Sequence, residues 1–245
     1  DFQDKTVGLI KVEAEPIFAK EYAFNELSKA LSLLRFFHCA SKNPDCTCFT
    51  VPSGYSIIHA RYSLMLINEM ITNTKADYAL TYKPWLICCS DIQNFKSNGL
   101  DILHDLINIK RNEFQDNLLN SLMLFSKCSI LSDYSEKLTA IFVALESLLL
   151  KNENGQIQAT ISERIAFTIS DNKEERKEIV QLIKGIYSLR SKFLHHGKKF
   201  DDVEKFKKFM LKIWKFFQTL IQSERSKKFQ SNDAFFHWID DKKFS

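Results

Sequence analysis

The sequence predicts a mainly α-helical protein, with a smaller mixed α+β region at its N-terminal end. Glycine and proline are scarce, at 6 and 4 of 245 residues. Few tight turns are therefore available, which favours long helices over a many-stranded sandwich. From about residue 100 onward, apolar residues recur at spacings of three and four, as in amphipathic helices. We expect residues 1–99 to form the mixed region and residues 100–245 to form a helical domain.

The regular apolar spacing predicts individual helices. We expect them over residues 18–38, 132–150, 160–169, 173–194 and 201–222, with a last turn or two over 233–240. Ser132 stands at the start of the helix expected over residues 132–150, so its hydroxyl is the expected N-cap. The chain contains 21 phenylalanines, which predicts a core rich in aromatic rings.

The N-terminal region has weaker patterns. Residues 6–12 are rich in β-branched side chains and favour a strand, whereas Asn, Pro, Asp and Gly favour a loop over residues 40–54. Periodicity leaves residues 55–71 open between a helix and one or two strands. Residues 84–95 are equally open.

Hydropathy, the N-terminal residues and the cysteines predict where the protein is located. No apolar run reaches the roughly 18 residues that a membrane span requires. Residues 1–11 lack the basic start and apolar stretch of a secretory signal. We therefore expect no membrane association and a cytoplasmic location, with the six cysteines as reduced thiols. The chain begins at Asp1 without an initiator Met, so we expect it to continue from a longer protein.

Arg190 is a charged residue in an apolar stripe. On an ideal helix, which turns about 100° per residue, Arg190 lies within about 40° of Ile179, Ile183 and Ile186. Burying an unpaired guanidinium there is costly, so Arg190 needs an acidic partner, a subunit interface or an anionic ligand. Glu146, at the margin of its own apolar stripe, is a candidate for the acidic partner. From the pattern alone a boundary carboxylate on a solvated edge is favoured for Glu146, and the family resemblance described below favours the pairing instead.

His195 follows Arg190 near the expected helix end. It lies about 140° from Arg190 on an ideal helix, and Gly197 is the expected stop. A histidine in the last turn has its protonated form favoured by the helix dipole. Such a group beside a fixed cation suits phosphodiester cleavage, because a base must take the ribose 2′-OH proton while a cation stabilises charge on phosphate. No metal or cofactor is required. The alternative is structural, since arginine and His-Gly are both common at helix ends.

Two segments resemble a known family. The string Tyr-Ser-Leu-Arg-Ser-Lys-Phe-Leu-His-His-Gly over residues 187–197 resembles the signature of HEPN domains, an arginine followed after four to six residues by a histidine. More narrowly it resembles the ApeA-like HEPN branch, whose motif reads approximately Arg-Ser-Lys-x-x-His-Gly. Residues 137–149 resemble the helix of that branch that is centred on Ala-Leu-Glu-x-Leu.

The resemblance implies an all-α bundle that usually dimerises and brings two Arg/His pairs together. It also implies metal-independent RNA cleavage in prokaryotic toxin–antitoxin or antiviral systems. By match to the motif, Arg190 and His195 take the catalytic positions, and Ser191, Lys192 and His196 support them. Ser191 stands where Asn, Asp or His is frequent in the family. His196 stands where the narrower motif has Gly, which leaves His196 as an alternative functional histidine.

Basic residues follow the Arg/His segment. Residues 198–228 hold ten basic and four acidic residues, a surplus of +6 against +4 for the whole chain. A local positive charge of this size favours binding of a polyanion, or it only keeps the surface solvated. We expect RNA phosphates to contact Lys198, Lys199, Lys205, Lys208 and Lys212, with Lys215 continuing the stripe. An ordinary solvated face is the alternative.

Other chemistries are not supported. His38, Cys39, Cys46, Cys48 and His59 lack the paired cysteine spacing of structural zinc sites. The sequence also has no Gly-rich phosphate loop, no Gly-x-Ser-x-Gly and no His-Glu-x-x-His. The leading interpretation is thus a metal-independent endoribonuclease domain, partnered by RNA and by a second copy or other defence-complex subunits through the Arg190 helix. The alternative is a non-catalytic HEPN module that serves as an RNA- or protein-binding scaffold.

Overall fold

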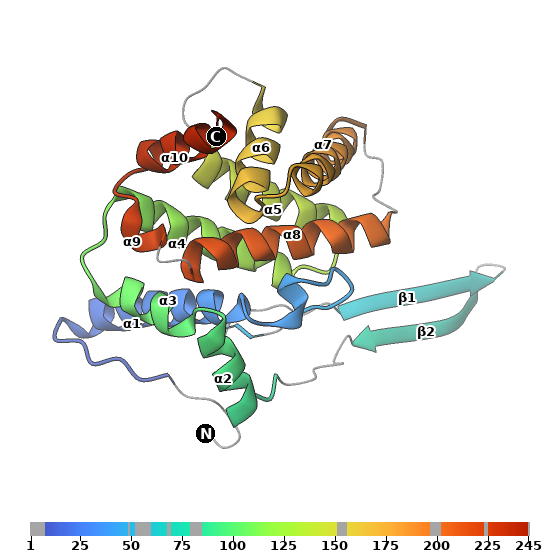
Figure 1. The fold of residues 1–245 in the computed structure, drawn as a ribbon. Coiled ribbons are helices and arrows are strands. Elements are labelled where there is room, and N and C mark those ends of the chain that lie inside the picture. Colours follow the sequence, from blue (N-terminus) through green and yellow to red (C-terminus); the bar gives the residue numbers. More distant parts are fainter. Residues whose placement is uncertain are drawn as a thin grey trace. The chain divides into compact units, whose positions relative to one another are not determined.

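The structure is a computed structural model that describes most of the chain. The described residues are 8–48, 50, 51, 60–67, 70–78, 85–150, 156–196, 202–222 and 225–244, of which 60–78, 192–196, 225 and 226 are described by their backbone alone. The chain divides into two compact units (Figure 1). One unit comprises Asp1–Ser28 and Phe49–Leu86, and the other comprises Lys29–Cys48 and Ile87–Ser245.

The first unit contains the start of a helix and a hairpin. Helix α1 spans Pro16–Arg35, and its residues up to Ser28 belong here. Strands β1 (Ala60–Ile67) and β2 (Met70–Tyr78) pair antiparallel, with a register irregularity between Met65 and Leu66. The sequence pattern left residues 55–71 open between helix and strand, and the described part of this range is strand. The strand expected over residues 6–12 is wrong for residues 8–12, which are largely exposed and pair with no strand.

A mixed α+β region at the N-terminal end is not supported. Such a region needs a helix packed along a sheet, so that both bury their apolar faces. The hairpin is a two-stranded sheet, and the described part of α1 within the same unit does not pack along it. Residues 84–95, whose structure the pattern left open, contribute the start of a helix. The described structure is mainly α-helical, as the sequence predicts.

The second unit is built from helices that follow one another closely along the chain. Helix α4 packs along α5, α6 packs along α7, and α8 contacts α3, α6 and α7. Within the described residues, no helix is both long and apolar enough to cross a bilayer. The elements are α2 (Cys89–Ser97), α3 (Leu100–Asn108), α4 (Glu113–Ser126), α5 (Tyr134–Leu149), α6 (Ile157–Ile169), α7 (Lys173–His196), α8 (Val203–Gln222), α9 (Arg225–Lys228) and α10 (Asn232–Phe244), with short 3₁₀ turns η1 (Cys39–Ser41) and η2 (Lys127–Ile130).

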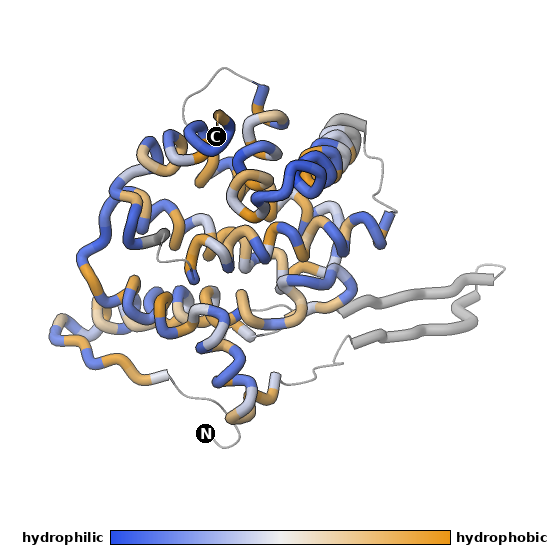
Figure 2. The backbone as a smooth tube through the Cα atoms, viewed as in Figure 1, coloured by the Kyte–Doolittle hydropathy of each residue, from blue (hydrophilic) through white to orange (hydrophobic). Residues whose placement is uncertain are grey.

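Aromatic rings fill the core of this unit, as predicted. Hydrophobic and hydrophilic residues alternate along α4, α5 and α8 at helical spacing (Figure 2). Phe125 of α4 lies 5.0 Å from Phe217 of α8, and Phe142 of α5 lies 5.4 Å from Phe209, between ring centroids. The fully buried phenylalanines are Phe36, Phe114, Phe125, Phe142, Phe206, Phe209, Phe216, Phe217 and Phe235.

The segment Lys29–Cys48 packs with the C-terminal helices, so the division differs from a single boundary after residue 99. The Phe36 ring stacks on Trp214 of α8 at 5.4 Å, and the Trp214 Nε1 donates a hydrogen bond to the Phe36 carbonyl at 2.9 Å. The buried Lys137 ammonium of α5 donates to the carbonyls of Pro44 and Cys46. These contacts join residues far apart in sequence, which a reading of local patterns does not detect.

The N-cap of α5 is Asp133 and not Ser132, which corrects the sequence prediction. The Asp133 carboxylate accepts from the backbone amides of Ser135 and Glu136 at 2.8 and 3.0 Å. A carboxylate caps these amides and also opposes the positive end of the helix dipole. The carboxylate is a stronger acceptor than a hydroxyl, so Asp133 and not Ser132 caps the helix.

We expect Asp133→Ala to lower the free energy of unfolding by about 0.5–2 kcal/mol, because two amides of α5 lose their acceptor. Ser132→Ala is the matched control and should be neutral, since Ser132 is exposed and lies outside the helix. Urea titration followed by circular dichroism measures both. An equal loss in the two variants would contradict the assignment of the cap.

Candidate functional site

Helices α5 and α7 position the two residues that the sequence singled out. Along α7, Ile179, Ile183 and Ile186 are buried and face the core. The same stripe continues to Arg190 one turn later, as the periodicity predicts. Along α5, Phe142 and its apolar neighbours are buried, and Glu146 follows one turn later. Glu146 and Arg190 are thus brought together where two apolar stripes meet.

Arg190 and Glu146 form an ion pair. The Arg190 Nη1 lies 2.9 Å from the Glu146 Oε1, with the arginine side chain 15% exposed and the glutamate side chain 26% exposed. The expected pairing is therefore present. The Arg190 Nε is buried and makes no hydrogen bond within the described structure. The Nε–H group is therefore a buried donor without a partner in the described structure.

Tyr187 lies beside the Arg190–Glu146 ion pair, and the sequence patterns did not identify it. The charges of both Arg190 and Glu146 act on its hydroxyl. Burial raises the pKa of Tyr187, and the nearby negative charge of Glu146 adds to this effect. The Arg190 guanidinium lies 5.6 Å from the Tyr187 ring and 5.7 Å from the Phe142 ring. Tyr187 precedes Arg190 by three residues, and this spacing was the available signal.

The histidines lie on the last turn of α7. The helical backbone continues through His196, so the predicted helix and its end are confirmed to within two residues. The side chains of Lys192, His195 and His196 lie outside the described residues, as do Gly197, Lys198 and Lys199 entirely. Ser191 is described and exposed. Positions 190 and 195 of a continuous helix lie about 140° apart around its axis.

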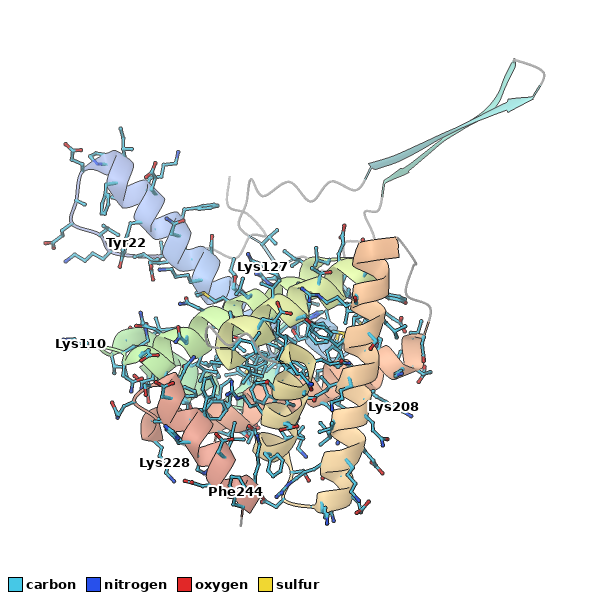
Figure 3. All side chains as sticks on the ribbon, turned by 90° about the horizontal axis from the view of Figure 1, so that it is seen from above. Tyr22, Lys110, Lys127, Lys208, Lys228 and Phe244 are labelled. Carbon is cyan, nitrogen blue, oxygen red and sulfur yellow. The ribbon has the colours of Figure 1, made fainter. Side chains whose placement is uncertain are left out.

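The lysines of α8 divide into two groups. Lys212 is bound to Glu175 of α7 at 2.8 Å, and the Lys205 ammonium lies against the backbone of Gly185. Lys208 and Lys215 are exposed and have no ion pair within the described residues. Lys208 projects outward at the edge of the helices (Figure 3). Only part of the expected lysine stripe is therefore available to a polyanion.

The cysteines and histidines show no metal-binding arrangement. Within the described part of the chain, no three His, Cys, Asp or Glu side chains are grouped in a way that would hold a metal ion. His38 instead caps η1, its Nδ1 accepting from the Ala40 amide at 3.0 Å. His59 lies outside the described residues.

Comparison with known proteins assigns no family to this chain. No family model matches it, and the comparisons with curated proteins and with solved structures also find no match. The fold and the site define a mainly α-helical protein with a largely buried Arg–Glu–Tyr cluster between two helices.

Proposed function

We propose that the chain carries an HEPN-type, metal-independent endoribonuclease domain that acts in prokaryotic defence or as a toxin. The observation that supports it most is the Arg190 guanidinium, which is largely buried in an apolar stripe with its Nε unbonded. The HEPN-like motif around Arg190 and His195 supplies the reaction class. We also propose a cytoplasmic setting, which rests on the six cysteines as reduced thiols and on residues 1–11, which lack the pattern of a secretory signal.

The unbonded donor suits an anionic ligand. A buried donor without a partner costs about 1–3 kcal/mol, so a structure that retains one gains from a ligand that binds it. Glu146 occupies Nη1 and holds the guanidinium in place. A phosphate oxygen that reaches Nε would form a charge-assisted hydrogen bond, which is roughly twice as strong as a neutral one.

Tyr187 adds a neutral donor next to this cation. Its raised pKa keeps the hydroxyl protonated throughout the physiological range. The hydroxyl can therefore donate a hydrogen bond to a phosphate oxygen. In this proposal Arg190 and Tyr187 bind the phosphate and Glu146 orients Arg190, with no role for a metal ion.

Histidine supplies the proton transfers in the proposed reaction. A neutral imidazole takes the 2′-OH proton of the ribose, and the 2′-oxygen attacks phosphorus. The bond from phosphorus to the 5′-oxygen breaks, and that oxygen receives a proton from a protonated imidazole. The products are a 2′,3′-cyclic phosphate and a free 5′-hydroxyl. Arg190 stabilises the charge on the phosphate oxygens as it develops.

The proposed site needs more than one copy of the chain. Positions 190 and 195 lie about 140° apart around α7, so a second copy packed along this helix is the simplest way to complete an Arg/His site. Val143, one turn from Glu146 on α5, is 40% exposed and gives this face an apolar element. We therefore propose a homodimer, or a contact with other defence-complex subunits, through α7.

RNA cleavage in the presence of EDTA tests the proposal. Labelled single-stranded RNA is incubated with the whole chain, and the fragment ends are identified by phosphatase resistance and mass spectrometry. We expect fragments with 2′,3′-cyclic phosphate ends, with or without EDTA. A protein that cleaves no RNA, or that cleaves only when a divalent ion is present, would contradict the proposed mechanism.

The exposed lysines provide a separate prediction about RNA binding. Lys208→Ser with Lys215→Ser should weaken binding and reduce the slope of log affinity against log salt by about 1 to 2, because two fewer counterions are released. Lys243→Ser is the control, since Lys243 lies on α10 and is engaged by Glu163 and Asp240. Fluorescence anisotropy at several salt concentrations measures the slope. An unchanged slope would assign the two lysines to an ordinary solvated surface.

A non-catalytic scaffold is the second candidate. It is favoured by the engagement of Arg190 with Glu146 and Tyr187, which is also what a purely structural arginine would show. Glu146→Gln distinguishes the two functions. In a scaffold, the variant loses stability without a change in any RNA-dependent activity, whereas in a nuclease it changes the rate of cleavage at temperatures where the fold is intact.

A further inference from the structure

One side of α7 is polar and leads along the helix toward position 195. Residues 181, 188 and 195 are spaced by nearly two full turns, so they lie on one side of the helix at intervals of about 10 Å. Gln181 and Ser188 are exposed, whereas the side that carries Ile183 faces the core. We name this side, defined by Gln181, Ser188 and position 195, the α7 strip.

A glycine flanks the α7 strip on one side. Gly185 lies inside α7, where glycine costs helix stability relative to alanine. A Cβ atom at this position would lie 2.8 Å from the Lys205 Nζ and 3.2 Å from the Lys205 Cε. The missing side chain therefore leaves the place that the Lys205 ammonium of α8 occupies beside α7. Within the described residues this ammonium forms no ion pair, not even with Glu178 two turns earlier on the same side of α7.

A second lysine flanks the α7 strip on its other side. Positions 184 and 185 are about 100° apart around the helix, and positions 181 and 188 lie between them. Lys184 is half-buried and also forms no ion pair in the part of the chain that the structure describes. Its carbonyl accepts hydrogen bonds from the Gln158 Nε2 of α6 and from the Ser188 Oγ, which holds this turn of α7 in place. Two positive charges without an acidic partner thus lie on either side of an exposed polar surface.

We propose that the α7 strip is the path of a single-stranded RNA, whose phosphates bind Lys184 and Lys205 a few nucleotides away from the bond that is cut. Each nucleotide carries a phosphate, so a strand along the strip meets both cations. The two cations lie across the width of one helix, about 10 Å, which fits one strand rather than the two backbones of a duplex. This inference rests on the proposed ribonuclease function, and it adds that the substrate is a strand that extends beyond the cut.

Binding of a labelled single-stranded RNA tests the path. Lys184→Ser with Lys205→Ser should lower the affinity at low salt by at least about tenfold, because two charged contacts are lost. The slope of log affinity against log salt should fall by about 1.4, since fewer counterions are released from a single strand. Lys110→Ser with Lys127→Ser is the matched control, because it removes the same charge from exposed lysines away from the strip (Figure 3). Fluorescence anisotropy at several salt concentrations measures both pairs, and the control should bind like the wild type.

The length of the RNA and the glycine give two further readouts. The Lys184/Lys205 double variant should raise the KM of a long strand by at least about tenfold and leave its kcat unchanged. It should cleave a dinucleotide like the wild type, because a dinucleotide does not reach the two lysines. Gly185→Ala should weaken binding of the long strand, because its Cβ takes the place of the Lys205 ammonium. The same variant should unfold at an equal or higher urea concentration, since alanine is the better helix former.

The outcomes separate this inference from the proposed reaction. A wild type that binds RNA, with a double variant of equal affinity and equal salt slope, would overturn the path and leave the nuclease intact. An equal loss in the control pair would also overturn it, because only net charge would then matter. A wild type that binds RNA through Lys184 and Lys205 but cleaves none would contradict the reaction and support the path. A wild type that binds no RNA would contradict both.

Discussion

Arg190→Ala and His195→Ala are each expected to lower the rate of RNA cleavage by about 10²- to 10⁴-fold, the usual loss when a positioned catalytic group is removed. Arg190 would lose its contact with the phosphate, and His195 would lose the ability to transfer a proton. EDTA should change neither the wild-type rate nor the residual rates. Single-turnover cleavage of a labelled RNA measures each variant.

Matched variants separate catalysis from folding. Lys177→Ala removes a charge from the same helix at an exposed ion pair with Glu174, and should cleave at the wild-type rate. Arg190→Lys keeps the charge but loses the fork that serves Glu146 and phosphate together, so it should rescue stability more than activity. Circular dichroism checks that each variant is folded at the assay temperature.

The neighbouring histidine gives the assignment a sharp test. His196→Ala should reduce cleavage only mildly, because the Arg-x₄-His pattern assigns the functional position to His195. If His196→Ala is the inactive variant and His195→Ala is active, the functional histidine is His196. If Arg190→Ala and His195→Ala both retain full activity, the proposed site is wrong and the scaffold is favoured.

Phe36→Ala is expected to lower the free energy of unfolding by about 3–5 kcal/mol, as large core deletions do. Phe36 is fully buried, stacks on Trp214, and packs edge-on against Phe37 and Phe125. Its removal leaves a cavity between the segment Lys29–Cys48 and the C-terminal helices. Urea unfolding monitored by tryptophan fluorescence measures the loss, because Trp214 reports directly on this contact.

Phe244→Ala is the control for this experiment. Its ring is 92% exposed at the end of α10, and the variant should unfold like the wild type (Figure 3). If Phe36→Ala is as stable as Phe244→Ala, residues 29–48 do not belong to the helical unit. A loss confined to a separate early transition would also place them in a unit of their own.

Local sequence patterns predicted much of the fold. The apolar spacing of three and four predicts α5, α6, α7 and α8 to within a few residues, because each buries one face against neighbours. The charge of Arg190 within such a stripe predicted a partner, and Glu146 is that partner. The same reasoning applies to Lys137, whose position one turn before Ile141 places a cation on the buried face of α5.

Tertiary structure decided what the local patterns left open. Residues 29–48 join the helical unit because Phe36 and Trp214, 178 positions apart, pack on each other. Asp133 caps α5 in place of Ser132 because its carboxylate reaches two amides. Tyr187 belongs to the Arg190 cluster because α5 brings Glu146 within reach of both. The contact between Phe36 and Trp214 crosses between elements, where spacing along one helix carries no information, whereas the Asp133 cap is local and depends on which side chain reaches the two amides.

The sequence by itself determined that the chain is mainly helical and that Arg190 lies at the border of a buried stripe. Only the tertiary structure decided that Glu146 does pair with Arg190 and that the Arg190 Nε stays unbonded within the described residues. The physical reason is that periodicity records which face of a helix is buried. The partner that buries it is selected by packing of the whole unit.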